Sequence, residues 1–94
     1  MIILGQRFPV STWREVAQQT LETLAELEED RFDQIVGKFP HFVGRESNKF
    51  RRSRQLRNGT FMETNLSAQA IHQYCRQIAE EAGLSSVDWR VELA

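Results

Sequence analysis

Hydrophobic residues return at helical spacing in the first third of the chain. Between residues 13 and 27 they recur every three or four positions, which predicts an amphipathic helix of about four turns. Thr12 precedes this stretch, and Thr12-x-x-Glu15 fits a capping box, in which a hydroxyl and a carboxylate satisfy free backbone amides. The stripe expected to face the core comprises Trp13, Val16, Ala17, Thr20, Leu21, Leu24 and Leu27. The polar face comprises Arg14, Glu15, Gln18, Gln19, Glu22 and Glu26.

Two later stretches show the same periodicity. Hydrophobic residues at positions 32, 35, 36 and 39 predict a short second helix that Asp30 caps and Gly37 ends. A third helix is expected to begin after Ser67 and to end at Gly83, whose freedom to adopt positive φ suits a Schellman cap. Its buried stripe is expected to comprise Ala68, Ile71, Cys75, Ile78, Ala79 and Ala82.

Short apolar or alternating runs predict the strands. Ile2–Leu4 is typical of a brief buried strand, and residues 87–93 alternate as a strand with one wet face does. Asn58-Gly59 favours a hairpin turn between a strand near Leu56 and a strand over residues 60–64. The element order predicts a single α+β domain over residues 1–94. It would contain a small mixed sheet of three to four short strands with about three helices packed on it.

The connection before this hairpin is predicted in less detail. Residues 39–43 are expected to be extended, because Pro40 cannot continue a helix. Ser47 is expected to cap a single helical turn through Phe50.

Charge is distributed unevenly along the chain. Twelve basic and 13 acidic residues give a net charge of −1. Residues 1–37 sum to −4 and residues 58–94 to −3, whereas residues 38–57 carry seven basic residues against Glu46 alone. A concentrated positive block in a nearly neutral chain indicates an anionic partner for that block.

The candidate nucleic-acid-binding residues form the core of this block, within residues 45–57. They are Arg45, Lys49, Arg51, Arg52, Arg54 and Arg57. Arginine can fork onto phosphate oxygens, and Phe42 or Phe50 can stack on an unpaired base, so the segment predicts a contact to a nucleic-acid backbone. Two alternatives stay open: the arginines pair with the acidic faces of the first and third helices, or the segment docks on an acidic partner protein.

The chain also resembles a known kind of domain. The motif is Leu56-Arg-Asn-Gly-Thr-Phe-Met-Glu-Thr-Asn-Leu-Ser-Ala68, followed by a helix, Gly83-Leu84 and an acidic-aromatic strand, with Gly5 and Trp13 upstream. It is similar to an uncharacterised bacterial accessory domain attached to restriction-type or phage-defence proteins. The resemblance would cover most of the chain. It implies an accessory module of DNA-processing machinery and no active-site residue.

Other reactive residues do not assemble into a catalytic set. His72 and Cys75 lie three residues apart, but zinc needs more ligands, and Cys75 lies on the apolar stripe, so core packing is expected rather than a Cys–His nucleophile. If Phe61 points inward, Glu63 is expected to do so too, and its carboxylate then needs a partner. Anchoring of an arginine from residues 51–57 is favoured over a catalytic role for Glu63. Trp13 and Trp89 are expected in the core. The chain is therefore expected to be a non-enzymatic domain with no metal and no cofactor.

Location and partners follow from the same reading. A single cysteine cannot form an internal disulfide, no apolar run approaches the roughly 20 residues of a membrane span, and residues 1–4 lack the features of a signal peptide. We expect a cytoplasmic protein without membrane contact, working with a partner protein or a larger parent polypeptide. The alternative function is a protein-interaction or dimerisation module, including a homodimer, that uses the basic segment or the edge of the last strand.

Overall fold

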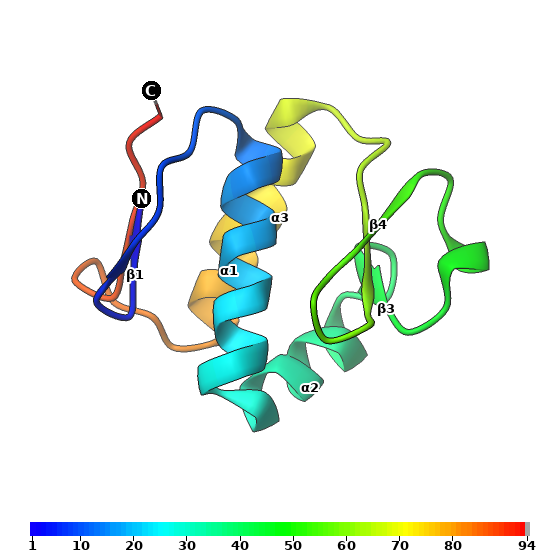
Figure 1. The fold of residues 1–94 in the computed structure, drawn as a ribbon, viewed down its shortest axis with the longest axis horizontal. Coiled ribbons are helices and arrows are strands. Elements are labelled where there is room, and N and C mark those ends of the chain that lie inside the picture. Colours follow the sequence, from blue (N-terminus) through cyan, green and yellow to red (C-terminus); the bar gives the residue numbers. More distant parts are fainter. Residues whose placement is uncertain (94) are drawn as a thin grey trace.

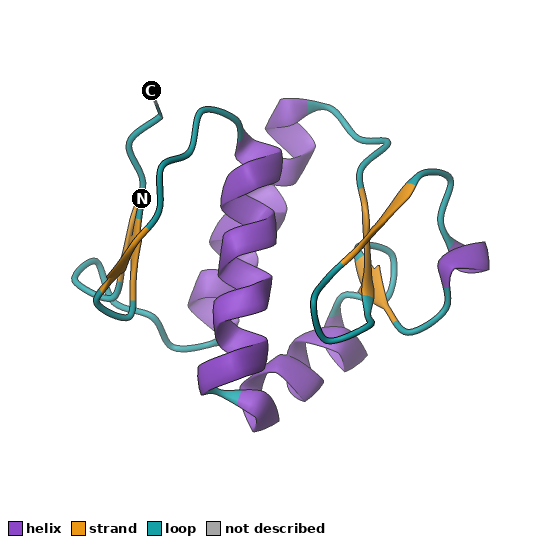
Figure 2. Ribbon diagram, in the orientation of Figure 1, coloured by secondary structure: helices purple, strands orange, loops and turns teal. Residues whose placement is uncertain are grey.

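The computed structural model describes residues 1–93 and shows three helices and two small antiparallel sheets (Figures 1 and 2). The helices are α1 (Trp13–Leu27), α2 (Glu29–Lys38) and α3 (Ala68–Glu81). The first sheet has the order β2-β1-β6, with β1 (Ile2–Ile3), β2 (Gln6–Arg7) and β6 (Trp89–Arg90). The second has the order β3-β5-β4, with β3 (Val43–Gly44), β4 (Ser53–Gln55) and β5 (Phe61–Glu63). A 3-10 turn, η1 (Ser47–Lys49), precedes β4.

The α+β class and the three helices are confirmed, but the single mixed sheet is wrong. The strands separate into two sheets on opposite sides of α1 and α3, and every pairing is antiparallel (Figure 1). Each sheet is built on a local hairpin. Leu4 and Gly5 both have positive φ (47° and 81°), and this tight turn creates β2, a strand that was not predicted. Each hairpin pairs with one further strand, so each sheet has three strands of its own and shares none with the other sheet.

The start of α1 is confirmed in detail. The Thr12 hydroxyl accepts a hydrogen bond from the Glu15 amide at 3.2 Å. The Glu15 carboxylate accepts from the Ser11 hydroxyl (2.9 Å), the Ser11 amide (3.3 Å) and the Thr12 hydroxyl (3.1 Å). The return bond to the backbone therefore reaches Ser11, one residue earlier than in the usual capping box. These bonds, led by that from the Ser11 hydroxyl, lower the pKa of Glu15 because they favour the charged carboxylate.

Both ends of α3 are also confirmed. The Ser67 hydroxyl accepts from the Ala70 amide at 3.1 Å. Gly83 has φ +71°, its amide donates to the Glu80 carbonyl at 3.0 Å, and the next amide donates to the Ala79 carbonyl at 2.9 Å. These two bonds are the Schellman pair.

One hydrophobic core joins the helices to the second sheet and to the segments that flank the first. Its fully buried side chains include Val16, Leu21, Leu24, Phe32, Ile35, Phe42, Val43 and Met62. From α3, Ile71, Cys75, Ile78 and Ala82 contribute to it. Trp13 and Trp89 are half-buried and pack against this core, and the Trp89 indole donates to the Thr20 hydroxyl at 3.1 Å.

Several predicted positions are wrong at the ends of elements. Leu27 is 47% exposed and Ala68 is exposed, because each is a terminal residue of its helix. The last strand is only two residues long. Before it, the Asp88 carboxylate closes a turn by accepting from the Ser85 hydroxyl (3.1 Å) and the Ser85 amide (3.2 Å), and Val87 in this turn is 77% exposed.

The connection from α2 to β3 also differs from prediction. The helix runs through Gly37, and Glu28 rather than Asp30 occupies its N-cap position. Residues 40–42 form a turn instead of an extended run, because the amides of Phe42 and Val43 both donate to the Phe39 carbonyl (3.0 Å and 3.1 Å). The helical turn near Ser47 forms as η1, but the prediction that Ser47 caps it is wrong, because Ser47 is its first residue and Glu46, at the N-cap position, makes no side-chain cap bond.

Candidate nucleic-acid interface

The basic segment lies in the second sheet and in the loop that leads into it. It leaves β3, passes through η1 and becomes β4, which pairs with β5 in a hairpin (Figure 1). The hairpin turn forms as predicted: Gly59 has φ +90°, and the Asn58 side chain accepts from the Thr60 amide at 3.1 Å. The Leu56 amide donates to the Thr60 carbonyl at 2.7 Å and closes the hairpin.

The six predicted cations are all exposed, but they do not have the same partners. Arg45 pairs with Asp33 of α2 at 2.8 Å, and Arg54 donates to the Gln18 side chain of α1 at 2.9 Å. In the part of the chain that the structure describes, the ion-pair partner of Lys49 is Glu46, at the long distance of 3.9 Å.

Arg51 and Arg52 differ from the other cations of this segment, and we call their guanidinium groups uncommitted because no side chain among the described residues pairs with them. Within residues 1–93, neither guanidinium has an ion pair or a hydrogen bond to another side chain. The alternative in which the arginines pair within the molecule therefore applies to other cations of the segment, but it does not apply to Arg51 and Arg52.

Glu63 fixes the backbone beneath these two arginines. The residue is 6% exposed, and its carboxylate accepts from the amides of Arg51 (3.1 Å) and Arg52 (3.0 Å). Thr64 adds two bonds to the Arg52 carbonyl, from its amide (2.8 Å) and its hydroxyl (2.6 Å). The prediction that Glu63 pairs with an arginine side chain is wrong, because its carboxylate binds main-chain amides instead. The prediction that it points inward with Phe61 is wrong as well, since Met62, between them, is the side chain of β5 that points into the core. Among the described residues, the guanidinium groups of Arg51 and Arg52 make no contact with this carboxylate.

Glu22 was predicted on the polar face of α1, and that prediction is wrong. The side chain is 7% exposed and accepts from the Arg57 amide (3.1 Å) and the Arg57 Nε (3.2 Å), with Nη2 also at 3.1 Å. Gln18 and Glu22 lie one turn apart on α1 and hold Arg54 and Arg57 respectively. We call Gln18 and Glu22 the clamp, and sequence reasoning missed it. Its signal in the sequence is the i, i+4 spacing of two polar residues on a helix, which is typical of a solvent-exposed face as well.

Phe42 is unavailable for base stacking, which corrects that expectation. It is fully buried and stacks on Tyr74 with ring centroids 4.5 Å apart and planes 3° apart. Phe50 is half-buried and lies over Gly44.

The His72–Cys75 pair is divided between two environments. Cys75 is fully buried, and burial raises the pKa of its thiol to about 12. The His72 ring stacks on Trp13, with centroids 3.9 Å apart. In the part of the chain that the structure describes, no hydrogen bond joins the two side chains, and no three metal-ligating side chains cluster.

Cys75 is expected to be inert in the folded protein. At pH 8 its thiol is protonated and shielded, so labelling by a chromogenic disulfide reagent should be slow in buffer and complete in denaturant. Stopped-flow absorbance would measure both rates. Native labelling as fast as that of a free thiol would contradict the buried position.

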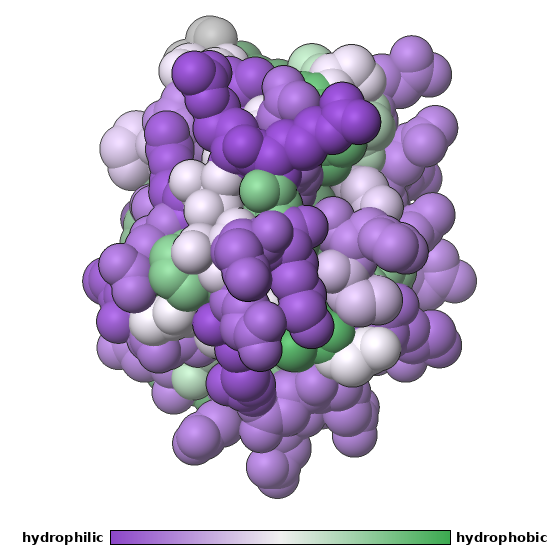
Figure 3. Space-filling model, turned by 90° about the vertical axis from the view of Figure 1, so that its right-hand side faces the viewer, coloured by the Kyte–Doolittle hydropathy of each residue, from purple (hydrophilic) through white to green (hydrophobic). Residues whose placement is uncertain are grey.

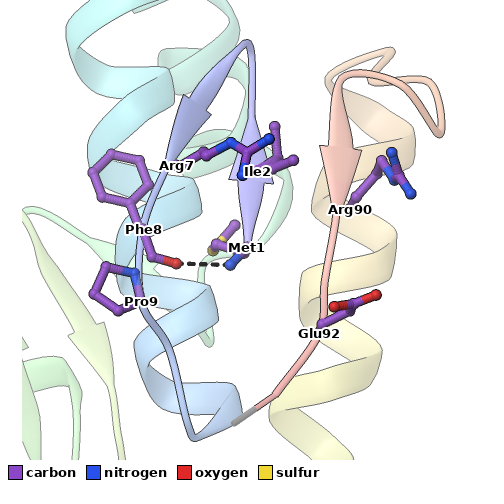
Figure 4. Close-up of a pocket in the computed structure, with 7 residues that line it drawn as sticks. All are labelled: Met1, Ile2, Arg7, Phe8, Pro9, Arg90 and Glu92. Atoms are coloured by element: carbon purple, nitrogen blue, oxygen red, sulfur yellow. Dashed lines mark hydrogen bonds between the residues drawn. The ribbon is translucent and has the colours of Figure 1, made fainter.

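A second basic site lies at the other end of the molecule, on the first sheet. A cleft of about 480 Å³ is lined by Arg7, Arg90 and Glu92 together with Met1, Ile2, Phe8 and Pro9 (Figure 4). Ile2 pairs with both Arg7 and Arg90, so the two arginines flank it on one face of the sheet. Glu92 lowers the net charge of this cleft, and among residues 1–93 no carboxylate accepts from the amides of Arg7 or Arg90 as Glu63 does from those of Arg51 and Arg52.

No family model, curated protein or solved structure matches this chain. Within residues 1–93, none of the helices has the length and apolar character needed to cross a bilayer. The functional argument is therefore carried by the geometry of the basic segment.

Proposed function

We propose that this chain is a non-enzymatic accessory domain that contacts a nucleic-acid backbone through its basic loop, defined as residues 49–54. Two observations together carry the proposal. The guanidinium groups of Arg51 and Arg52 are uncommitted, and the buried Glu63 holds the main chain of the same two residues. A preorganised loop loses little conformational entropy on binding, and arginine forks match phosphate geometry.

The other four predicted residues contribute unequally to this proposal. Lys49 and Arg54 lie within the loop, with one weak and one neutral partner. Arg45 and Asp33 form an exposed pair, which stabilises a fold by only about 0–1 kcal/mol, so Arg45 can exchange its partner for a phosphate at small cost. Arg57 is tied to the buried Glu22 and has a structural role in this scheme.

The proposal also assigns the domain to a bacterial DNA-processing or defence system, in which it would be an accessory module. This part of the proposal comes from the resemblance of residues 56–68. It places the chain beside a partner protein or within a larger parent polypeptide, and co-purification of that partner with tagged protein would test it.

The experiment compares two variants with the same loss of charge. Arg51→Gln/Arg52→Gln removes the uncommitted pair, and Arg7→Gln/Arg90→Gln removes the pair on the first sheet. Fluorescence anisotropy would follow labelled DNA and RNA oligonucleotides over a range of salt concentrations. The basic-loop variant should bind more weakly to all sequences, and its log–log salt slope should fall by about 0.7–0.9 per lost phosphate contact.

The control variant should retain wild-type affinity and slope. Melting temperatures of both variants should stay close to wild type, because exposed and unpaired arginines contribute little to folding. The proposal fails if the wild-type protein has no salt-dependent affinity for DNA or RNA, or if both variants lose affinity equally.

A protein-interaction or dimerisation module is the second candidate function. The observation in its favour is that Val87 and Leu93 are exposed hydrophobic residues next to β6, an edge strand of the first sheet. Sedimentation velocity would detect a dimer. A dimer that Val87→Asp dissociates, in a protein without nucleic-acid affinity, would favour this candidate.

A further inference from the structure

The outer face of the second sheet is defined by alternation along its strands. Val43 and Met62 are fully buried and pair with each other, so they point into the core. The next residue on β3, Gly44, and the preceding residue on β5, Phe61, point to the opposite face. Gly44 pairs with Phe61, and Phe61 pairs with Gln55, so these three residues form a row across that face.

Phe50 occupies the space above Gly44 in this row. A Cβ atom at Gly44 would lie 3.2 Å from the Cζ atom of Phe50, so the glycine makes room for the ring. Gly44 is paired with Phe61, so the Phe50 ring lies over the position of β3 that is opposite Phe61 on the same face. Both phenylalanines are half-buried residues rather than part of the fully buried core.

The basic loop borders the same face. Glu63 lies two residues after Phe61 and shares its side of β5, and Glu63 holds the amides of Arg51 and Arg52. Two uncommitted guanidinium groups thus begin at the edge of a face that carries two aromatic rings. The side of the molecule formed by this part of the chain is mainly hydrophilic with small hydrophobic areas between (Figure 3).

We infer that the ligand of this surface is single-stranded nucleic acid, with an unpaired base stacked on Phe50 and Phe61 while Arg51 and Arg52 hold the adjoining phosphates. This inference rests on the proposed function and adds the class of nucleic acid to it. Aromatic rings beside a positively charged groove bind bases through their π-faces, and the paired bases of a duplex do not present those faces. Exposed Gln55, in the same row, can hydrogen-bond the edge of the stacked base.

The test uses aromatic substitutions, because they leave the charge unchanged. Phe50→Leu/Phe61→Leu should weaken binding to a single-stranded oligonucleotide roughly 5- to 150-fold, the range expected for loss of one stacked base. The salt slope should stay at the wild-type value, since no phosphate contact is removed. Phe8→Leu, a half-buried phenylalanine beside the first sheet, is the matched control and should bind as wild type does.

A second measurement needs no variant. Wild-type protein should bind a single strand more tightly than the duplex of the same sequence, and a 2-aminopurine base in the single strand should change its fluorescence as it stacks. Equal affinity for single strand and duplex, or full single-strand affinity in the double phenylalanine variant, overturns this inference. In that case salt-dependent binding that Arg51→Gln/Arg52→Gln weakens would leave the proposed function standing. Absence of affinity for every nucleic acid would overturn both.

Discussion

Glu63→Ala is expected to destabilise the protein by about 2–4 kcal/mol, because it removes two charge-assisted hydrogen bonds to the amides of Arg51 and Arg52. The loop would lose the side chain that holds its main chain against β5. Urea denaturation followed by circular dichroism would measure the loss. Glu63→Gln retains one acceptor oxygen and should lose about half as much.

The same variant connects stability to binding. A loop that is no longer held must be ordered again when it meets a ligand, so Glu63→Ala should also weaken nucleic-acid affinity at temperatures where the protein remains folded. Arg51→Gln/Arg52→Gln should weaken affinity while leaving stability nearly unchanged. An unfolding free energy of Glu63→Ala equal to that of wild type would show that the carboxylate does not hold the loop.

Phe42→Ala is expected to cost about 3–5 kcal/mol, the range found for removing a buried phenylalanine. Its ring is fully buried and lies parallel to Tyr74, so truncation would leave a cavity that α3 and β3 cannot easily close. The loss is a large part of the 5–15 kcal/mol that stabilises a typical domain. Thermal and urea unfolding would both report it.

Phe50→Ala is the control for this prediction. Because Phe50 is half-buried on the outer face of the second sheet, its truncation should cost markedly less than that of Phe42. Similar losses for the two variants would contradict the division between a core phenylalanine and a surface phenylalanine.

Local features of this fold could be predicted because their causes lie within a few residues. Thr12 and Ser67 cap helices through bonds that span three residues, and Gly83 ends α3 through bonds to the preceding turn. Asn58-Gly59 likewise sets the hairpin turn by its own backbone preference. The helices, the caps and this hairpin, and with them the α+β class, therefore followed from the sequence.

The basic segment itself could be predicted, because the positions of charged residues are read directly from the sequence. The sequence did not show which of its cations have partners within the molecule. Arg57 is bound by Glu22 and Arg54 by Gln18, across separations of 35 and 36 residues. Helical spacing assigned Glu22 to the solvent face, and only the packing of the hairpin against α1 turns that position into a buried clamp.

Tertiary structure also decided where the strands and aromatic residues went. Amphipathic alternation states that a strand has a buried face, but it does not state which strands pair, and the hairpins on either side of the helices formed separate sheets. Phe42 and Phe50 are both phenylalanines near Pro40 and the arginines, yet one is in the core and the other is on the surface. Their environments depend on α3 and on the space above Gly44, and such long-range contacts depend on how the assembled elements pack rather than on local sequence.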